Sequence, residues 1–345
     1  MKSDNQSLTV YDIARMAGVS PATVSKVINR RRGVNAETAA KVIDILASTG
    51  FAPRWKAGSS KVIGIVCPPY DGVLLDSYDS QIISRCFDAL RKKEYSLELI
   101  SHVPAARKKN VRSLFASHEN LSGLIAIASP PNYPCCLDIL ANQTSIPGVV
   151  IGKLADCQPN SIPAAGNHIW ADDYAAGYQL ATLFLRHNHK TFLLVTASLD
   201  DIGHNHRLKG IMAALKAEKI PDHAITIQEV KEDLRKNGNQ IAMTMVCSKK
   251  KPSAVIFTNG AICAGFVIGC VNMKIQIPAE FSVAGFEDAS ELEHLPIPVT
   301  AMHTPAEHLG AAAVTSLLSQ LEHHTLPMAR VLQHQLCIRS SVAIC

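Results

Sequence analysis

The chain has 345 residues, of which 47% are apolar, and carries a formal net charge of +5. This length is too great for a single hydrophobic core and predicts two or three domains. No run of about 18 apolar residues occurs, which excludes a membrane-spanning helix, and we expect no membrane partner.

The positive charge is concentrated at the start of the chain. Residues 1–60 contain nine Lys and Arg but four Asp and Glu, whereas residues 61–345 contain 25 residues of each sign. The whole excess of positive charge therefore lies in one small segment. A basic segment attached to a neutral body is typical of a nucleic-acid-binding module.

Residues 9–29, TVYDIARMAGVSPATVSKVIN, predict two short helices joined by a turn. Thr9 and Asp12 have the spacing of a capping box, which satisfies the first free N–H groups of a helix. Gly18 tolerates the left-handed backbone of a turn. Ser20 is the expected N-cap of the second helix, because its hydroxyl can accept a hydrogen bond from a free N–H group.

The second of these helices has one apolar and one small, polar face. Val24, Val27 and Ile28 fall on the apolar face. The opposite face carries Ala22, Ser25, Lys26 and Asn29. A face with no bulky or acidic residue, but with a hydroxyl, an amide and one cation, is typical of a helix that lies in a DNA major groove. The alternative is an ordinary helical hairpin with a solvated face.

A third helix is expected after a basic run. Arg30, Arg31 and Arg32 directly follow the second helix, where they can reach phosphates that flank the groove. Asn35 is the expected cap of the third helix, and Gly50 its end. We expect its apolar residues Val42, Ile43 and Leu46 to face inward.

The cysteines and histidines do not predict a metal site. None of the ten cysteines forms a CxxC pair, and Cys135 and Cys136 are adjacent. Fourteen histidines include the pairs His187/His189 and His204/His206, but no Cys or carboxylate cluster completes a ligand set. We therefore expect reduced thiols, no metal and no cofactor. The N-terminus has no hydrophobic signal sequence, so we expect a cytoplasmic protein.

From Lys61 onward, apolar runs alternate with amphipathic helices. In a first series we expect strands over Val62–Cys67, Leu97–Ser101, Leu124–Ala128 and Val149–Ile151, with a helix over Asp79–Lys92. In a second series, after Trp170, we expect helices over Asp173–Arg186, Arg207–Glu218, Gly238–Cys247 and Ile262–Val271. The strands of that series are Phe192–Thr196, Ile225–Gln228, Ala254–Phe257 and Ser282–Ala284.

This alternation predicts an α/β fold of parallel doubly wound sheets. Two consecutive series predict two lobes. Ligands of such sheets bind at the carboxyl ends of the strands, so a cleft between the lobes is the expected small-molecule site.

Several motifs, in this order and spacing, resemble the LacI/GalR (lactose/galactose repressor) family of bacterial transcription regulators. They are the helix pair quoted above, GFAP, VIGIV, DDYAAG, GHNHRLKGI, FTN, IPAEFSVAGFED and PVTAMHTPAEHLG. The resemblance runs from Leu8 to Ser340. It implies a helix-turn-helix headpiece over residues 1–52, a short linker over 53–60, and a two-lobed core of periplasmic-binding-protein type over 61–345.

The resemblance also implies a function. Members of the family form homodimers, bind a pseudopalindromic double-stranded operator on the bacterial nucleoid, and respond to a small-molecule effector. Repression is the commoner outcome in the family. The end of the chain, RSSVAIC, has no leucine heptad of the kind that tetrameric members carry, so we expect a dimer.

The family's base-reading positions fall on Pro21, Ala22 and Lys26. Most members have arginine at position 26, and the ammonium of Lys26 lacks the planar fork of a guanidinium, so we expect looser discrimination between bases. Further DNA contacts, largely with phosphates, are expected from Thr9, Tyr11, Ser20, Thr23, Ser25, Asn29, Arg30, Arg31 and Arg54.

The linker departs from the family pattern. The run FAPRWKAGSSKVIGIV is shorter than usual and lacks the leucine that other members insert into the minor groove. Trp55 either serves as that apolar wedge or packs the headpiece onto the core.

The effector positions implied by the resemblance are Asp172 or Asp173, Arg207, Asn259 and Glu287, with Thr304 in place of a family glutamine. Carboxylates, a guanidinium and an amide suit a polyhydroxylated ligand. Alternatively, an aspartate caps the following helix and Arg207 pairs with it. Gly260 replaces a usual Asp, and Glu287 is one methylene longer than the usual Asp. A sugar, a sugar acid and a nucleoside therefore all stay open.

Two other classes of protein fit the sequence less well. A free-standing solute-binding protein does not explain the capped, basic N-terminal segment. An enzyme is not expected, because no GxGxxG, P-loop or GxSxG occurs in a strand-turn-helix context, and the effector positions contain no nucleophile beside a base.

Overall fold

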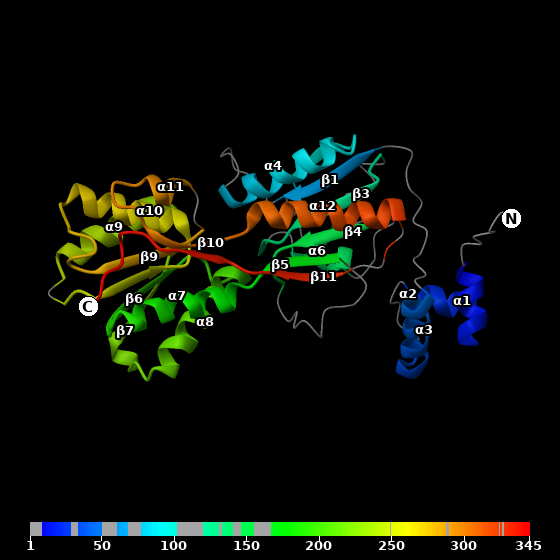
Figure 1. Cartoon of the computed structure of the whole chain (residues 1–345), viewed down its shortest axis with the longest axis horizontal. Coiled ribbons are helices and arrows are strands. Elements are labelled where there is room, and N and C mark those ends of the chain that lie inside the picture. Colours follow the sequence, from blue (N-terminus) through cyan, green and yellow to red (C-terminus); the bar gives the residue numbers. More distant parts are fainter. Residues whose placement is uncertain are drawn as a thin grey trace. The chain divides into compact units, whose positions relative to one another are not determined.

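The computed structural model describes most of the chain (Figure 1). The described residues are 9–28, 34–49, 61–67, 77–101, 120–130, 133–140, 146–154, 167–248, 250–287, 290–323, 325 and 328–345. The chain divides into two compact units. The first unit is Met1–Leu74, Asp79–Trp170 and Glu307–Arg330, and the second is Leu75–Tyr78, Ala171–Ala306 and Val331–Cys345.

The N-terminal segment folds into three helices, α1 (Val10–Ala17), α2 (Pro21–Ile28) and α3 (Ala36–Thr49). The predicted capping box is confirmed, because the side chains of Thr9 and Asp12 each accept the other's backbone N–H at the start of α1. Gly18 ends α1 with φ 67°, the left-handed conformation that favours glycine. The predicted caps Ser20 and Asn35 accept hydrogen bonds from the N–H groups of residues 23 and 38, at 3.0 and 2.7 Å.

These helices enclose a small core of their own, formed by Ile13, Ala14, Ala17, Val24, Val27, Val42 and Leu46. The prediction that Ile43 faces inward is wrong, since this side chain is 46% exposed. Ile45 packs against the core instead. Residues 42, 45 and 46 have the i, i+3, i+4 spacing of a single helix face, and position 43 lies to one side of it. Gly50, the expected end of α3, lies outside the described residues.

The first unit contains a six-stranded sheet with the order β11-β5-β4-β3-β1-β2. The neighbouring pairs from β5 to β2 are all parallel. Its strands are β1 (Val62–Cys67), β2 (Ser96–Ser101), β3 (Gly123–Ile127), β4 (Gly148–Ile151), β5 (Asn167–Ala171) and β11 (Ala329–Leu332). Its described helices are α4 (Ser77–Arg91), α6 (Tyr133–Leu140) and α12 (Ala306–His323).

The second unit contains another six-stranded sheet, with the order β12-β10-β9-β8-β6-β7. Its pairs are parallel except that of β10 with β12. The strands are β6 (Phe192–Thr196), β7 (Ile225–Glu229), β8 (Ala254–Phe257), β9 (Ser282–Phe286), β10 (Thr300–His303) and β12 (Gln335–Cys337). The helices are α7 (Asp173–Arg186), α8 (Ile202–Ala217), α9 (Leu234–Val246), α10 (Gly260–Asn272) and α11 (Ser290–His294), with a short 3₁₀ turn at Asp222–Ala224.

Helices cover both faces of the second sheet (Figure 1). Alternate residues of β6 face opposite sides, so Phe192 and Leu194 pack with α7 and α8 whereas Leu193 and Val195 pack with α9 and α10. Strands buried on both faces read as continuous apolar runs in the sequence. This is the α/β architecture of doubly wound parallel sheets that the alternation of elements predicted.

Two glycines let α7 and α8 approach closely. A Cβ atom on Gly177 would lie 2.1 Å from the carbonyl oxygen of Arg207, and one on Gly210 would lie 2.1 Å from that of Tyr174. No side chain larger than hydrogen fits at either position. The backbones of α7 and α8 therefore touch, and this contact brings the first turn of α7 beside the first turns of α8.

The structure corrects two expectations, the one that the two series of elements are consecutive and the one that a helix begins at Arg207. Helix α12 follows β10 of the second unit, but from Glu307 its residues belong to the first unit. Helix α8 begins at Ile202 rather than Arg207, because the side chain of Asp201 caps it by accepting the N–H of His204. No helix among the described residues is long and apolar enough to span a membrane.

Candidate functional site

The outer face of α2 is accessible. Ala22, Ser25 and Lys26 are exposed, whereas Val24 and Val27 on the other face are buried. Pro21 and Thr23 are partly buried. Lys26 makes no ion pair with a described residue, so its charge is available to a partner outside the chain. The expected DNA contacts Asn29, Arg30, Arg31 and Arg54 lie outside the described residues, as does Trp55.

Some of the expected DNA-contacting side chains already form hydrogen bonds within the headpiece. The hydroxyl of Thr9 donates to Asp12 at 2.6 Å, and the hydroxyls of Ser20 and Thr23 lie 2.8 Å apart. Thr9 thus fixes the start of α1, and the pair of Ser20 and Thr23 fixes the start of α2. Tyr11 on α1 is 74% exposed, so its side chain is accessible to DNA.

A buried polar cluster lies at the carboxyl ends of strands in the second unit. Asn259 follows β8 and Glu287 follows β9, whereas Asp173 is the first residue of α7. Arg207 reaches the same place from α8. The carboxyl ends of parallel strands meet at one edge of a sheet, so residues far apart in the sequence come together there.

Arg207 is at the centre of this cluster. Its Nε donates to Asp173 Oδ1 at 2.8 Å, and its Nη1 donates to the carbonyl oxygen of Thr258 at 2.8 Å and to Glu287 Oε1 at 2.5 Å. The guanidinium carbon also lies 4.9 Å from the centre of the Phe286 ring. The Arg207 side chain is 7% exposed, so the cation is held between two carboxylates away from bulk water.

Glu287 links Arg207 to the start of α10. Its Oε2 accepts hydrogen bonds from Asn259 Nδ2 at 2.8 Å and from the backbone N–H of Gly260 at 3.3 Å. The side-chain oxygen of Asn259 accepts the N–H groups of Ala261 and Ile262 and so caps α10. Glu287 has φ 59°, a conformation that L residues seldom adopt. This turn directs the carboxylate back over the helix terminus.

The two carboxylates stay ionised in spite of their burial. Burial by itself would raise the pKa of Asp173, but the charge of Arg207 and the neighbouring His334 hold it well below its ordinary value of 3.8. Burial would likewise raise the pKa of Glu287, and Arg207 again holds it below the ordinary 4.5. The Arg207 pKa, which burial would lower, is raised by both carboxylates.

Of the two adjacent aspartates, only Asp173 joins this cluster. Asp172 caps α7 by accepting the N–H of Ala175 at 3.0 Å. The cap and the pairing with Arg207, which together made up one of the two alternatives, are thus divided between the two aspartates, and contact of either with an effector stays a prediction. One aspartate caps the helix, and the next pairs with Arg207.

The structure adds His334, which the sequence analysis did not identify. Its Nε2 lies 3.3 Å from Asp173 Oδ1, and its Nδ1 lies 3.4 Å from the hydroxyl of Thr304. The antiparallel register of β10 and β12 pairs Ala301 with Cys337, and continuing it places position 304 opposite 334. No motif surrounds His334 in the sequence, so only this strand pairing could have indicated its role.

A hydroxyl, an imidazole and a carboxylate in series resemble an activated nucleophile. In this cluster the side chain of His334 is 0% exposed, and Thr304 is 5% exposed. Asp173 Oδ1 also accepts a hydrogen bond from Arg207, so the charge of this carboxylate is balanced by the guanidinium. The series is therefore closed off from solvent and does not present a nucleophile to a substrate.

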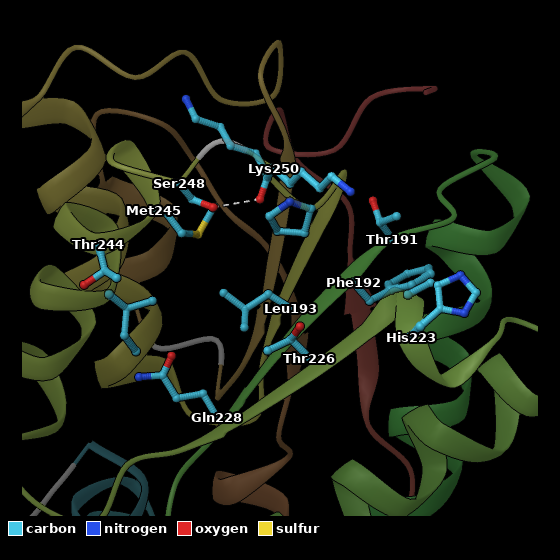
Figure 2. Close-up of a pocket in the computed structure, with 14 residues that line it drawn as sticks. Thr191, Phe192, Leu193, His223, Thr226, Gln228, Thr244, Met245, Ser248 and Lys250 are labelled. Atoms are coloured by element: carbon cyan, nitrogen blue, oxygen red, sulfur yellow. Dashed lines mark hydrogen bonds between the residues drawn. The ribbon is translucent and has the colours of Figure 1, made fainter.

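A groove lies near the amino ends of strands of the same sheet (Figure 2). This groove has a volume of about 330 Å³, with Leu193, Ile241 and Met245 among its lining residues. It is flanked by the start of β6, the segment before β7 and the end of α9. Ligands of parallel sheets bind at the carboxyl ends of strands, so the Arg207 cluster is the better candidate site. Within the described part of the chain, no group of His, Cys, Asp or Glu is arranged to hold a metal ion.

Comparison with known families gives one match at the N-terminal helices and another in the α/β part of the chain. Residues 9–54 match the family described as bacterial regulatory proteins, lacI family, and residues 181–342 match a periplasmic binding protein-like domain. Among curated relatives, the ribose operon repressor of Escherichia coli K12 is 27% identical over 94% of this chain and 96% of its own. The transcriptional repressor PurR of Pasteurella multocida is 26% identical over 97% of this chain and 98% of its own.

Solved structures share the fold. A LacI family regulator from Enterococcus faecium with bound ribose has a TM-score of 0.68 at 18% identity, covering 82% of this chain and 99% of that one. The lac repressor dimer bound to operator and the anti-inducer ONPF has a TM-score of 0.67 at 22% identity, covering 98% and 100%.

Proposed function

The chain belongs to the LacI/GalR family of bacterial transcription regulators, and we propose that it is a repressor whose operator affinity is set by a small polyhydroxylated metabolite, a sugar or sugar derivative. The observation that carries the proposal is the Arg207 cluster, a guanidinium held between two ionised carboxylates at the strand ends, in a chain that begins with a helix-turn-helix. The curated relatives support it, since they are named as repressors.

The DNA-binding part of the proposal assigns residues 1–52 to operator binding and 53–60 to a linker. Helix α2 enters the major groove, with Pro21, Ala22 and Lys26 at the base edges. The exposure of Ala22 and Lys26 supports this orientation. Tyr11 and the arginines that follow α2 contact phosphates, which supply affinity without sequence preference. The protein acts in the cytoplasm, where the chromosome lies.

The effector part of the proposal assigns residues 61–345 to ligand binding and dimerisation. Asp173, Arg207, Asn259 and Glu287 contact ligand hydroxyls, because carboxylate oxygens accept hydrogen bonds and the guanidinium and amide donate them. Thr304 supports the cluster through His334. Binding then favours one arrangement of the core, and the change in operator affinity equals the ratio of ligand affinities for the two arrangements.

The working unit in this proposal is a homodimer. Strand β2 is at the edge of the first unit's sheet, and Leu99 on it is 54% exposed. Phe87 on α4 is 50% exposed. Large apolar side chains that stay exposed on an edge strand and a helix mark an interaction surface. Phe87→Asp and Leu99→Asp should weaken the dimer in sedimentation experiments. Leu137→Asp on α6, at a residue that is 53% exposed, should not.

No enzymatic activity is part of the proposal. The relatives are repressors, and the polar groups of the cluster are engaged with one another rather than with an exposed nucleophile.

The test of the proposed function is fluorescence anisotropy with genomic DNA fragments, followed by a thermal-shift screen of metabolites. We expect selected fragments to bind at least 1,000-fold more tightly than random DNA, the lower end of the usual specificity range of about 10³–10⁷. A ligand at 100 times its dissociation constant should stabilise the protein by about 2.7 kcal/mol. Equal affinity for all fragments would contradict the proposal.

A further inference from the structure

Glu287 occupies the donors that an acidic ligand would need. Arginine binds a carboxylate or phosphate through two parallel N–H groups, taken either from Nη1 and Nη2 or from Nε and Nη2. In Arg207 the Nε donates to Asp173, and Nη1 donates to Glu287 and to the carbonyl of Thr258. Each bidentate edge has thus lost one donor to the protein. A single hydroxyl takes one donor, whereas the bidentate binding of an acid takes two.

The charges of the cluster also disfavour an acidic ligand. Its described members include two ionised carboxylates, Asp173 and Glu287, and one guanidinium. The histidines that face them are His334, beside Asp173, and His204, whose Nδ1 lies 3.2 Å from the carbonyl oxygen of Thr258. An anionic ligand would therefore approach two carboxylates in a site where burial weakens screening by water.

Both carboxylate oxygens of Glu287 are held by hydrogen bonds. Its Oε2 accepts Asn259 Nδ2 and the N–H of Gly260, and Oε1 accepts Arg207. A Cβ atom at position 260 would lie 2.8 Å from the carbonyl oxygen of Glu287, so the missing side chain of Gly260 lets the turn close over the helix start. These contacts fix the carboxylate within the cluster, so Glu287 takes part in the site rather than moving aside for a ligand.

We propose that Glu287 is the residue that makes this site selective for uncharged, hydroxyl-rich ligands and excludes sugar acids and phosphates. The inference rests on the proposed function, because it assumes that the cluster is the effector site. Glu287 acts by neutralising Arg207 within the protein. Ligand hydroxyls then donate to the free lone pairs of Asp173 and Glu287, and ligand oxygens accept from Arg207 Nη2.

The experiment compares matched neutral and acidic probes. These are D-ribose with D-ribonate, D-glucose with D-gluconate, D-galactose with D-galactonate, and inosine with inosine monophosphate, screened by thermal shift and measured by calorimetry. For the wild-type protein we expect binding of at least one neutral probe and at least tenfold weaker binding of its acidic counterpart. This comparison needs no variant, so it does not depend on whether a mutant folds.

Two variants assign the effect to Glu287. Glu287→Gln keeps the size and the contact with Asn259 but removes the charge, and it should reduce the preference for the neutral probe at least tenfold. Glu287→Asp keeps the charge and should retain the preference. Circular dichroism establishes that both variants are folded.

Three results would overturn the inference. They are tighter binding of an acid than of its neutral partner by the wild-type protein, an unchanged preference in Glu287→Gln, and no binding of any neutral probe. Operator binding, measured on the same samples, separates these results from a failure of the proposed function. A protein that binds its operator but prefers acids keeps its function as a regulator and loses only the role given to Glu287.

Discussion

Arg207 and Asp173 form a buried ion pair across two helices, with Nε 2.8 Å from Oδ1 and side chains that are 7% and 10% exposed. Helix α7 supplies the carboxylate, α8 supplies the guanidinium, and Gly177 allows the two backbones to touch one turn away. The pair therefore links the packing of α7 on α8 with the chemistry of the strand ends.

Removal of Arg207 should strongly destabilise the second unit. Arg207→Ala leaves two buried carboxylates without their cation, and loss of one partner of a buried pair costs about 3–5 kcal/mol. Adding Asp173→Asn and Glu287→Gln should restore part of this loss, because the charges that need compensation are gone. Urea denaturation of the three proteins measures the effect. A single mutant as stable as wild type would show that the pair is not buried in solution.

Acid should destabilise the protein through the same carboxylates. Asp173 and Glu287 have pKa values held below their ordinary 3.8 and 4.5, so between the two sets of values the unfolded chain binds more protons than the folded one. Their contribution to stability is complete above those ordinary values and is lost as pH falls through the lowered ones. The free energy of unfolding should fall less steeply below about pH 4 in Asp173→Asn than in wild type. An identical slope would contradict the shifted pKa of Asp173.

Gly177→Ala should separate α7 from α8. The new Cβ would lie 2.1 Å from the carbonyl oxygen of Arg207, so one helix must move. Overpacking of this kind typically costs about 1–3 kcal/mol. The displacement of α8 should also weaken the binding of any neutral probe that the wild-type protein binds. The control is Gln179→Ala on the exposed side of α7, which should change neither quantity.

The proposed roles of Lys26 on α2 and of Arg31 after it can be tested by removing each cation in turn. Lys26→Ala should cost about 1–3 kcal/mol on the cognate operator and relax the preference at one base pair in each half-site. Arg31→Ala should weaken binding to all sequences about equally and flatten the salt dependence. Equal losses on specific and random DNA in both mutants would mean that the two roles are wrongly assigned.

Local signals in the sequence predicted much of the fold. The capping box of Thr9 and Asp12, the caps Ser20 and Asn35, and the runs that form β1, β6 and β8 each depend on residues a few positions apart. Their physical causes lie within the segment, so the segment alone reveals them. Ile43 was misplaced because its neighbours, not its own hydrophobicity, decide which face of α3 is buried.

Long-range features could not be read in this way. Helix α12 has buried residues spread along its length, but nothing local indicates that it returns to the first unit. The contact of His334 with Asp173 depends on the register of β10 with β12. The resemblance to a family predicted Arg207, Asn259 and Glu287 as site residues, but not the contacts between them. Their direct hydrogen bonds, including the closure of Glu287 on Arg207, follow only from the folded strands.

The most direct test of the central claim is operator affinity, measured by fluorescence anisotropy with and without a metabolite found by thermal shift. The wild-type affinity should change by a factor of about 5–150, the usual range of a coupling free energy of 1–3 kcal/mol. Arg207→Lys keeps a cation between the carboxylates and Arg207→Ala removes it. Both should lose most or all of the response, while their ligand-free operator affinity stays within a few-fold of wild type, because the headpiece is unchanged. A full response in both variants would remove Arg207 from the effector site and contradict the account.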